Sequence, residues 1–319
     1  MEESQELKLY WANVCLLIRM ERQHLDDKAE EWTKNSGHPI DINYLGDTAE
    51  VPLREKLTEE AAGGKFEADA VVSTRFDLFC SKNFLAGIPE EFAPLGDDLP
   101  LRKSFLNSGI CHPQGIFHPV LAVPHLIICN TEKTGPGGHP ESLKDLLDTG
   151  WESQIVIGDP ALPSGRCFLF AMWYLFGDEG LEKIVENVVA KSAPSAARFS
   201  IMKDEFKLAI LPEIFAGPTQ KDNLKRIIPL EGIIALPSYL AIKKRAKERL
   251  LPFLKEAVYT DYFQEQYVRQ GALIPNHETL PPPENLSGLE EKMFFPKWSW
   301  IERRDMNYFD QQCNRVRIV

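Results

Sequence analysis

The stretch VIGDPALPSGRCFLFAMWYLFG, residues 156–177, decides how the fold of this chain is interpreted. It begins as an apolar strand, breaks at two prolines, passes a Ser-Gly pair and then stays apolar for the length of a helix. A strand that leads through a short turn into a buried helix is a building unit of α/β proteins. Because the first backbone N–H groups of a helix have no partners within it, such a turn can hold an anion.

Three consecutive residues of this turn carry groups that suit an oxyanion. Ser164 supplies a hydroxyl, Gly165 lets a ligand approach the backbone closely, and Arg166 adds a cation with a fork of donors. The plainer interpretation is that Ser164 only caps the helix and that Arg166 only faces solvent. The residues of the turn leave both interpretations open.

The composition indicates a globular protein that forms either two lobes or one large α/β unit. At 319 residues the chain exceeds what one core usually organises, and 44% hydrophobic with 26% charged residues excludes a disordered or fibrous chain. Lys and Arg number 36 against 47 Asp and Glu, so the formal net charge is −11, which argues against nucleic acid as a partner. The basic run at 242–249 is typical of the solvated face of a helix.

Targeting and redox signals are few. No apolar run is long enough to span a bilayer, and the first strand-like segment starts at Leu7, which leaves no room for a signal peptide. We therefore expect either the trimmed form of an exported protein, periplasmic or extracellular, or a cytoplasmic protein.

The six cysteines include no CxxC pair, which favours reduced thiols. Cys15 is expected to be buried, with an exposed reactive thiol as the alternative. No cofactor is expected, since the glycines near 135–150 lack the spacing of a nucleotide-binding loop.

Strand-like and helix-like segments alternate along the chain, which predicts an α/β fold. Strands are expected at 7–12, 40–46 and 68–74, a helix at about 180–191, and a loop at 192–200. Two apolar segments, 117–130 and 226–242, are interrupted by prolines, which crossing or edge strands tolerate. We therefore predict two doubly wound lobes joined by two crossing hinge strands. Residues 1–121 plus 235–319 would form lobe 1 and residues 122–234 lobe 2, with the aromatic segment 294–300 covering an apolar face of lobe 1.

The order of segments resembles the type II periplasmic solute-binding proteins of ABC transporters, in particular the branch that contains ferric-ion-binding proteins. The similarity spans about residues 7–276 and lies in LKLYWAN, ADAVVST, PVLAVPHLIICNTE, ESLKDLLDTGWESQIVIGDPALPSG, IPLEGIIALPSYLAIKKRAKE and QGALIPN. The resemblance implies a protein, not an enzyme, whose two lobes close on a small-molecule or anionic ligand. It also implies the membrane subunits of an ABC importer as a partner.

The resemblance implies binding residues on both lobes. On lobe 2 these are the residues of the turn, Ser164, Gly165 and Arg166. On lobe 1 they lie at the ends of two strands, where ligands of open α/β sheets bind: Ala12, Asn13, Ser73 and Thr74. Two further candidates are Arg198, with a surface arginine as the alternative, and Glu231, with a turn cap as the alternative.

The sequence departs from the ferric-ion-binding proteins at their metal ligands. The branch places a His after the first strand, a Glu after the third and a Tyr-Tyr pair later, whereas this chain has Val14, Thr74, and Ile214 with Phe215 at those places. None of these ligates iron in that way, so no metal site is expected and a carboxylate- or phosphate-bearing anion is the predicted solute. A metal bound through such an anion stays an alternative.

Two other classes of function remain open from the sequence. An enzyme on the same scaffold, of the kind found in cofactor biosynthesis, would need clustered catalytic Cys or His; Cys111, His112 and His118 are close in sequence but match no zinc spacing. A ligand-free interaction module would instead use the aromatic segment near the C-terminus.

Overall fold

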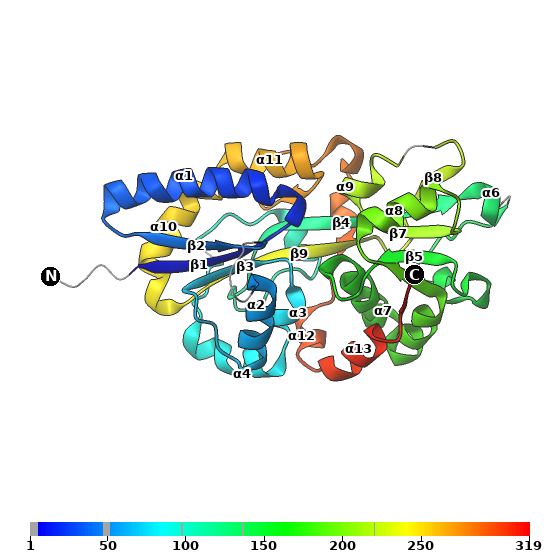
Figure 1. Cartoon of the computed structure of the whole chain (residues 1–319), viewed down its shortest axis with the longest axis horizontal. Helices are drawn as coiled ribbons and strands as arrows, with labels where there is room; N and C mark the ends of the chain where they lie inside the picture. The colour runs from blue at the N-terminus through cyan, green and yellow to red at the C-terminus, as the bar shows by residue number, and fades with distance from the viewer. Residues whose placement is uncertain (1–5, 47–51, 97, 136, 220) are drawn as a thin grey trace.

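The computed structural model describes residues 6–46, 52–96, 98–135, 137–219 and 221–319. In these residues one sheet of 12 strands passes through the molecule in the order β12-β6-β5-β7-β4-β9-β3-β1-β2, with β8 and β10 paired to β4 and β11 paired to β9. Helices cover both faces of the sheet at each end of the molecule (Figure 1). The predicted α/β class with two doubly wound lobes is confirmed.

Lobe 1 is built on three parallel strands in the order β3-β1-β2. The strands are β1 Leu7–Ala12, β2 Ile40–Tyr44 and β3 Ala70–Ser73. The helices are α1 Ile18–Ser36, α2 Leu53–Ala62, α3 Phe76–Phe79, α4 Lys82–Glu91, α5 Lys103–Asn107, α10 Lys247–Ala257 and α11 Asp261–Gly271. Helix α1 ends at Ser36, because Gly37 adopts the left-handed conformation with φ of 72°.

Lobe 2 contains a second set of parallel strands, with β5 between β6 and β7. These strands are β5 Ile155–Gly158, β6 Val188–Lys191 and β7 Leu208–Pro212, and β8 Leu224–Ile227 lies beside them on β4. The helices are α6 Thr131–Thr134, α7 Pro163–Asn187, α8 Pro194–Met202 and α9 Glu213–Ala216. Because the three strands run in the same direction, α7, α8 and α9 begin at the same edge of the sheet.

Two local predictions in lobe 2 are wrong. The expected helix at 180–191 is the second half of α7, which continues across a break at Gly177 (φ 68°, ψ −166°) and stops at Asn187. The next four residues form β6, whose β-branched Val188 and Val189 are buried against β5. The expected loop is helix α8, which starts with Pro194 in its first turn, where a proline costs no hydrogen bond.

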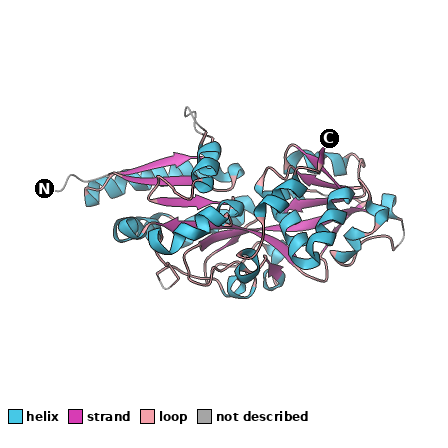
Figure 2. Cartoon of the chain, turned by 90° about the horizontal axis from the view of Figure 1, so that it is seen from below, coloured by secondary structure: helices cyan, strands magenta, loops and turns pink. Residues whose placement is uncertain are grey.

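Two long strands cross between the lobes, as predicted. They are β4 His118–Asn130 and β9 Ile233–Ile242, and they pair antiparallel from His118–Leu240 to His125–Ile234. Beyond this shared stretch β9 pairs with β3 in lobe 1, whereas β4 pairs with β7 and β8 in lobe 2. Figure 2 shows the strands continuing from one group of helices into the other.

The C-terminal segment contacts both lobes. It contains β10 Ile274–Pro275, β11 Met293–Phe294, α12 Trp298–Ile301, α13 Met306–Cys313 and β12 Arg317–Ile318. Strand β11 pairs with β9, whereas α13 packs on α7 and β12 pairs with β6. The predicted division at 121/122 and 234/235 stays a prediction, but α13 and β12, which it assigns to lobe 1, lie against lobe 2.

The aromatic residues of this segment divide in the same way. The Trp298 ring lies 5.0 Å from that of Phe117 and 5.7 Å from that of Tyr239, next to lobe 1. The Trp300 ring lies 5.5 Å from Phe170 and 5.1 Å from Trp173, both on α7. The expectation that these aromatics cover lobe 1 therefore holds for Trp298, whereas Trp300, on the same short helix α12, packs on α7 of lobe 2.

Candidate functional site

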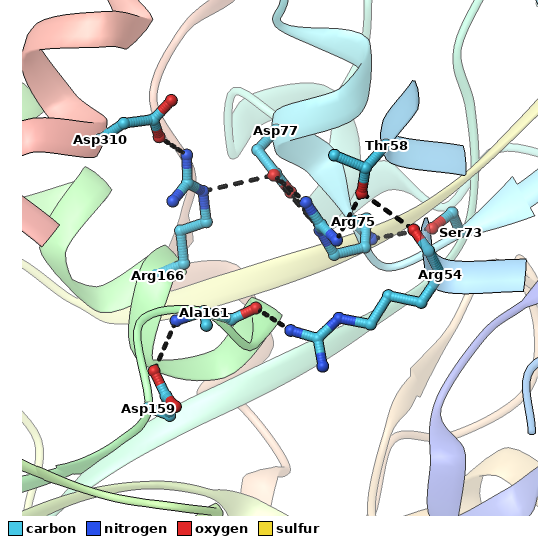
Figure 3. A network of polar contacts seen from close by, with 9 residues as sticks. All are labelled: Arg54, Thr58, Ser73, Arg75, Asp77, Asp159, Ala161, Arg166 and Asp310. Atoms are coloured by element: carbon cyan, nitrogen blue, oxygen red, sulfur yellow. Dashed lines mark hydrogen bonds and ion pairs between the residues drawn. The ribbon is translucent and has the colours of Figure 1, made fainter. Parts of the chain in front are cut away.

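The predicted turn before α7 lies where the two lobes meet. From lobe 1, Arg54 on α2 donates to the backbone oxygen of Ala161 in this turn, and Asp77 on α3 forms an ion pair with Arg166 on α7. Figure 3 shows these side chains converging from the two sides. We therefore take the turn 159–166 and the facing residues of α2 and α3 as the candidate site.

Arg166 is enclosed by the protein's own carboxylates. Its Nε lies 3.4 Å from Oδ2 of Asp77, its Nη2 donates to Asp310, and its guanidinium carbon lies 5.0 Å from the centre of the Phe309 ring. Only 12% of the side chain is exposed. Burial lowers the pKa of Arg166, but the nearby Asp77, Cys313 and Asp310 outweigh it and raise the pKa. The guanidinium is charged and has internal partners, so its predicted contact with a solute stays a prediction.

The Ser164 hydroxyl is bonded to a buried histidine. Nε2 of His125 lies 2.8 Å from Oγ of Ser164, and its Nδ1 lies 3.1 Å from the backbone oxygen of Val123. Burial lowers the pKa of His125 to about 4, so the ring is neutral at pH 7. Because a carbonyl oxygen only accepts, Nδ1 carries the proton and Nε2 accepts from Ser164. The Ser164 proton therefore points at His125 and not at the facing lobe.

Gly165 allows α7 to pack closely on the strand before it. A Cβ atom at Gly165 would lie 2.0 Å from the backbone oxygen of Gly158 and 3.0 Å from that of Asp159. No side chain fits in that space. The close approach at this glycine is one between helix and strand, and the predicted approach of a ligand stays a prediction.

The strand-end candidates of lobe 1 lie side by side. Ala12 at the end of β1 is the register partner of Ser73 at the end of β3, and the backbone N–H of Thr74 donates to the oxygen of Ala12 at 3.3 Å. Oγ of Ser73 accepts from the backbone N–H of Arg75 at 3.0 Å. All three candidates are buried, so the strand ends hold the loop that carries Arg75.

Asn13 belongs to a buried polar cluster behind these strand ends. Its Nδ2 donates to Oε1 of Glu21 at 2.6 Å and lies 3.3 Å from the hydroxyl of Tyr267. The same carboxylate accepts from Nε1 of Trp11 at 2.9 Å and from the Tyr267 hydroxyl at 2.9 Å. Burial raises the pKa of Glu21 to about 7, although these three donors lower it. The cluster joins the end of β1 to α1 and α11.

The last two predicted residues have partners outside the candidate site. Arg198 lies on α8 and donates to Oγ1 of Thr219 and to the backbone oxygen of Pro218, both at 3.1 Å. The Glu231 carboxylate accepts from the backbone N–H groups of Leu143 at 2.8 Å and Lys144 at 3.3 Å. Of the two roles considered for Glu231, the structure shows the cap.

Sequence reasoning missed two arginines of lobe 1. No motif in the sequence marks Arg54, whereas Arg75 directly follows the predicted Ser73-Thr74 strand end, which was a usable signal. Arg75 donates two hydrogen bonds to Asp77, from Nε to Oδ1 at 2.9 Å and from Nη2 to Oδ2 at 2.7 Å. Burial raises the pKa of Asp77, but the Arg75 hydrogen bonds and the Arg166 charge hold it below its usual value. Asp77 is therefore ionised between the two arginines.

The cysteines and histidines that the sequence singles out lie outside any cluster suited to a metal ion in the described part of the chain. Among the residues that the structure describes, no group of three or more His, Cys, Asp or Glu side chains is placed to hold a metal ion. Cys111 donates to the backbone oxygen of Phe105 at 3.3 Å, and His118 bonds the backbone oxygen of Pro100 at 3.0 Å. Cys15 is exposed, so the expectation that it is buried is wrong; it lies in a short 3-10 turn outside the sheet.

A groove of about 520 Å³ lies elsewhere on lobe 1, between α1 and α11. Its lining is mostly polar and includes Arg19, Gln23, His24, Asp27 and Gln266. None of the predicted binding residues lines it. In the described part of the chain, no helix has both the length and the apolar character to cross a membrane.

Comparison with known proteins identifies the family. The family model for bacterial extracellular solute-binding proteins matches residues 67–304, about three quarters of the chain. This chain is a member of that family. Members of this family bind solutes and are not enzymes. The role of this protein is therefore to bind a solute, and the enzyme alternative is excluded. No curated protein sequence matches it.

Solved structures share the fold of this solute-binding protein at low sequence identity. The apo ferric ion-binding protein A of Pasteurella haemolytica is 13% identical with a TM-score of 0.65, covering 97% of this chain and 96% of that one. The periplasmic binding protein AfuA of Actinobacillus pleuropneumoniae, solved with fructose-6-phosphate, is 15% identical with a TM-score of 0.61 and 98% of both chains covered. An ABC transporter protein of Clostridium perfringens is 15% identical with a TM-score of 0.63 and 98% of both covered. These matches support the two-lobed fold of periplasmic binding proteins.

Proposed function

We propose that this solute-binding protein holds a small anionic solute between its lobes and presents it, outside the cytoplasmic membrane, to the membrane subunits of an ABC importer. The carrying observation is Arg54, whose guanidinium reaches from lobe 1 to the backbone of the turn that begins α7. Its hydrogen bond there goes to a neutral carbonyl oxygen. An anion in this place would give the guanidinium a stronger, charge-assisted partner.

The surroundings of Arg54 support an anion. Arg75 lies within 3.5 Å of Oγ1 of Thr58, one helical turn along α2 from Arg54, so a second guanidinium group, paired with Asp77, lies on the same side of lobe 1. The start of α7 adds a partial positive charge, and its first turn contains no acidic residue. Asp77 is already neutralised by two arginines. The strand ends at Ala12 and Ser73 hold the loop that carries Arg75.

Asp159 indicates a second requirement of the solute. Its Oδ1 accepts from the backbone N–H of Ala161 at 2.8 Å, which fixes the carboxylate in the turn. The remaining carboxylate oxygen can accept from a hydroxyl group. We therefore favour an anion that also carries hydroxyl groups, such as a phosphorylated or carboxylated polyol. The sugar phosphate named with AfuA is of this class.

Ligand-induced thermal shifts, with dissociation constants from calorimetry, test the proposal. The panel is inorganic phosphate, sulfate, citrate, fructose 6-phosphate and ferric citrate. We expect one of the organic anions to raise the Tm, and Arg54→Gln to weaken its binding about 10- to 100-fold, as expected for a lost hydrogen bond between charged groups.

Arg269→Gln is the matched control, since this arginine is 67% exposed on α11 and pairs only one turn away with Glu265. Binding that is equally tight in Arg54→Gln and in the control would overturn the assignment of the site. If no member of the panel shifts the Tm, the anionic class is wrong. Binding of ferric citrate but not of citrate would instead favour a metal carried through an anion.

A further inference from the structure

The ion pair between Arg166 and Asp77 joins the two lobes, and a third element, α13, contacts the same arginine. Arg166 starts the second turn of α7 in lobe 2, Asp77 belongs to α3 in lobe 1, and Asp310 belongs to α13 near the C-terminus. The side chains of Arg166 and Asp77 are 12% and 7% exposed, and that of Asp310 is 48% exposed. Arg166 therefore pairs with one carboxylate of lobe 1, Asp77, and with one carboxylate of α13, Asp310.

Aromatic rings follow the same path. The ring of Phe76, beside Asp77, lies 5.1 Å from that of Phe170, one turn after Arg166 on α7. Phe170 lies 5.2 Å from Phe309, which precedes Asp310 on α13. Phe309 also stacks on Trp173 at 5.4 Å with an interplanar angle of 1°. Apolar contact thus extends from lobe 1 through α7 to α13.

The chain that carries α13 is tied to both lobes at short intervals. Strand β11 is paired with the crossing strand β9, and α12 holds Trp298 against lobe 1. Only residues 302–305 separate α12 from α13, and four residues span at most about 14 Å. Strand β12 then anchors the end of the chain on β6. We call residues 293–318 the C-terminal strap.

We propose that the C-terminal strap braces the lobes together before any solute binds, with Phe309 and Asp310 holding Arg166 against Asp77. Separating the lobes would part Arg166 from Asp77 and expose the contact between Phe76 and Phe170, whose burial favours the closed arrangement. Asp310 does not itself cross the interface. It acts as a positioning residue, since it and the Phe309 ring fix the direction of the guanidinium.

Small-angle scattering and hydrogen exchange of the full-length protein without added solute test this brace. We expect Asp310→Asn to increase the radius of gyration. We also expect the amides of 76–79 and 163–166 to exchange about two- to fivefold faster, as suits a partly exposed ion pair. Glu179→Gln is the control. Glu179 lies on α7, the helix of Arg166, and pairs with Lys183; the two side chains are 81% and 52% exposed.

A second variant separates bracing from simple loosening of the strap. Asp77→Asn lies on lobe 1, outside the strap, and removes the carboxylate that pairs with Arg166 across the interface. The proposal requires both variants to expand the molecule while the amides of β6, which pair with β12, keep their wild-type exchange. Unchanged scattering and exchange in either variant would overturn it. Since no solute is added, the result is independent of the anion panel.

Discussion

At the scale of single residues, the turn that starts α7 shows how side chains suited to a ligand can be used internally. Ser164 donates to His125, Gly165 faces the backbone of Gly158, and Arg166 is held by two carboxylates. Each of these partners comes from another element. The group that reaches from the facing lobe is Arg54, which no motif in the sequence marks.

Replacing Gly165 with alanine should destabilise the protein. The new methyl group would meet the Gly158 oxygen at 2.0 Å, so α7 must move away from β5. We expect a loss of about 3 kcal/mol in the free energy of unfolding, as for an overpacked core. Urea denaturation measures it. Gly150→Ala is the control, since nothing lies within 4 Å of a Cβ there; equal stability of the two variants would contradict the packing argument.

At the scale of elements, the pairing of strands corrects the local pattern. Residues 188–191 continue a helical pattern in sequence, but they form β6 because β5 and β12 offer backbone partners on both sides. The junction of β1 with α1 is a second example. There the buried carboxylate of Glu21 accepts from Trp11, Asn13 and Tyr267, which belong to three different elements or loops.

The Glu21 cluster should make stability depend on pH. The pKa of Glu21 is raised from 4.5 to about 7 by burial, so between these values the folded state keeps a proton that the unfolded state has released. The unfolded state then binds fewer protons, and the free energy of unfolding falls as the pH rises, by at most about 3 kcal/mol from this group.

The measurement is the difference in unfolding free energy between the wild type and Glu21→Gln from pH 4 to pH 8. This difference should fall through the window from 4.5 to 7 and level off above it. Glu30→Gln, on the exposed face of the same helix, should give a difference that does not fall with pH, because the pair with Lys34 lowers the pKa of Glu30. A flat profile for Glu21→Gln would mean that the carboxylate is ionised throughout the window.

At the scale of the whole molecule, the two lobes share one apolar core. The buried cluster is continuous from β1 through the crossing strands to β5 and the C-terminal strap, with Leu9, Val123, Val156 and Phe309 all fully or almost fully buried. Two crossing strands and the strap tie the lobes together. Lobe motion therefore has to bend these connections, and the ion pair of Arg166 adds to the resistance.

We expect the lobes to unfold together. Differential scanning calorimetry of the full chain should show one transition, with a calorimetric enthalpy close to the van't Hoff enthalpy, because no boundary divides the core cluster. Two resolved transitions, or a calorimetric enthalpy near twice the van't Hoff value, would show that each lobe is stable without the other.

The sequence by itself determined the alternation of strands and helices, the proline-interrupted strands that cross between the lobes, and the strand ends at which Ala12 and Ser73 meet. These follow from local periods of apolar residues and from turn chemistry, which are written in short windows of the chain. Only the tertiary structure decided which polar groups have internal partners and which reach the facing lobe. The partners of Ser164, Arg166 and Asn13 lie far away in sequence, and hydrogen bonds and ion pairs depend on distances that only folding sets.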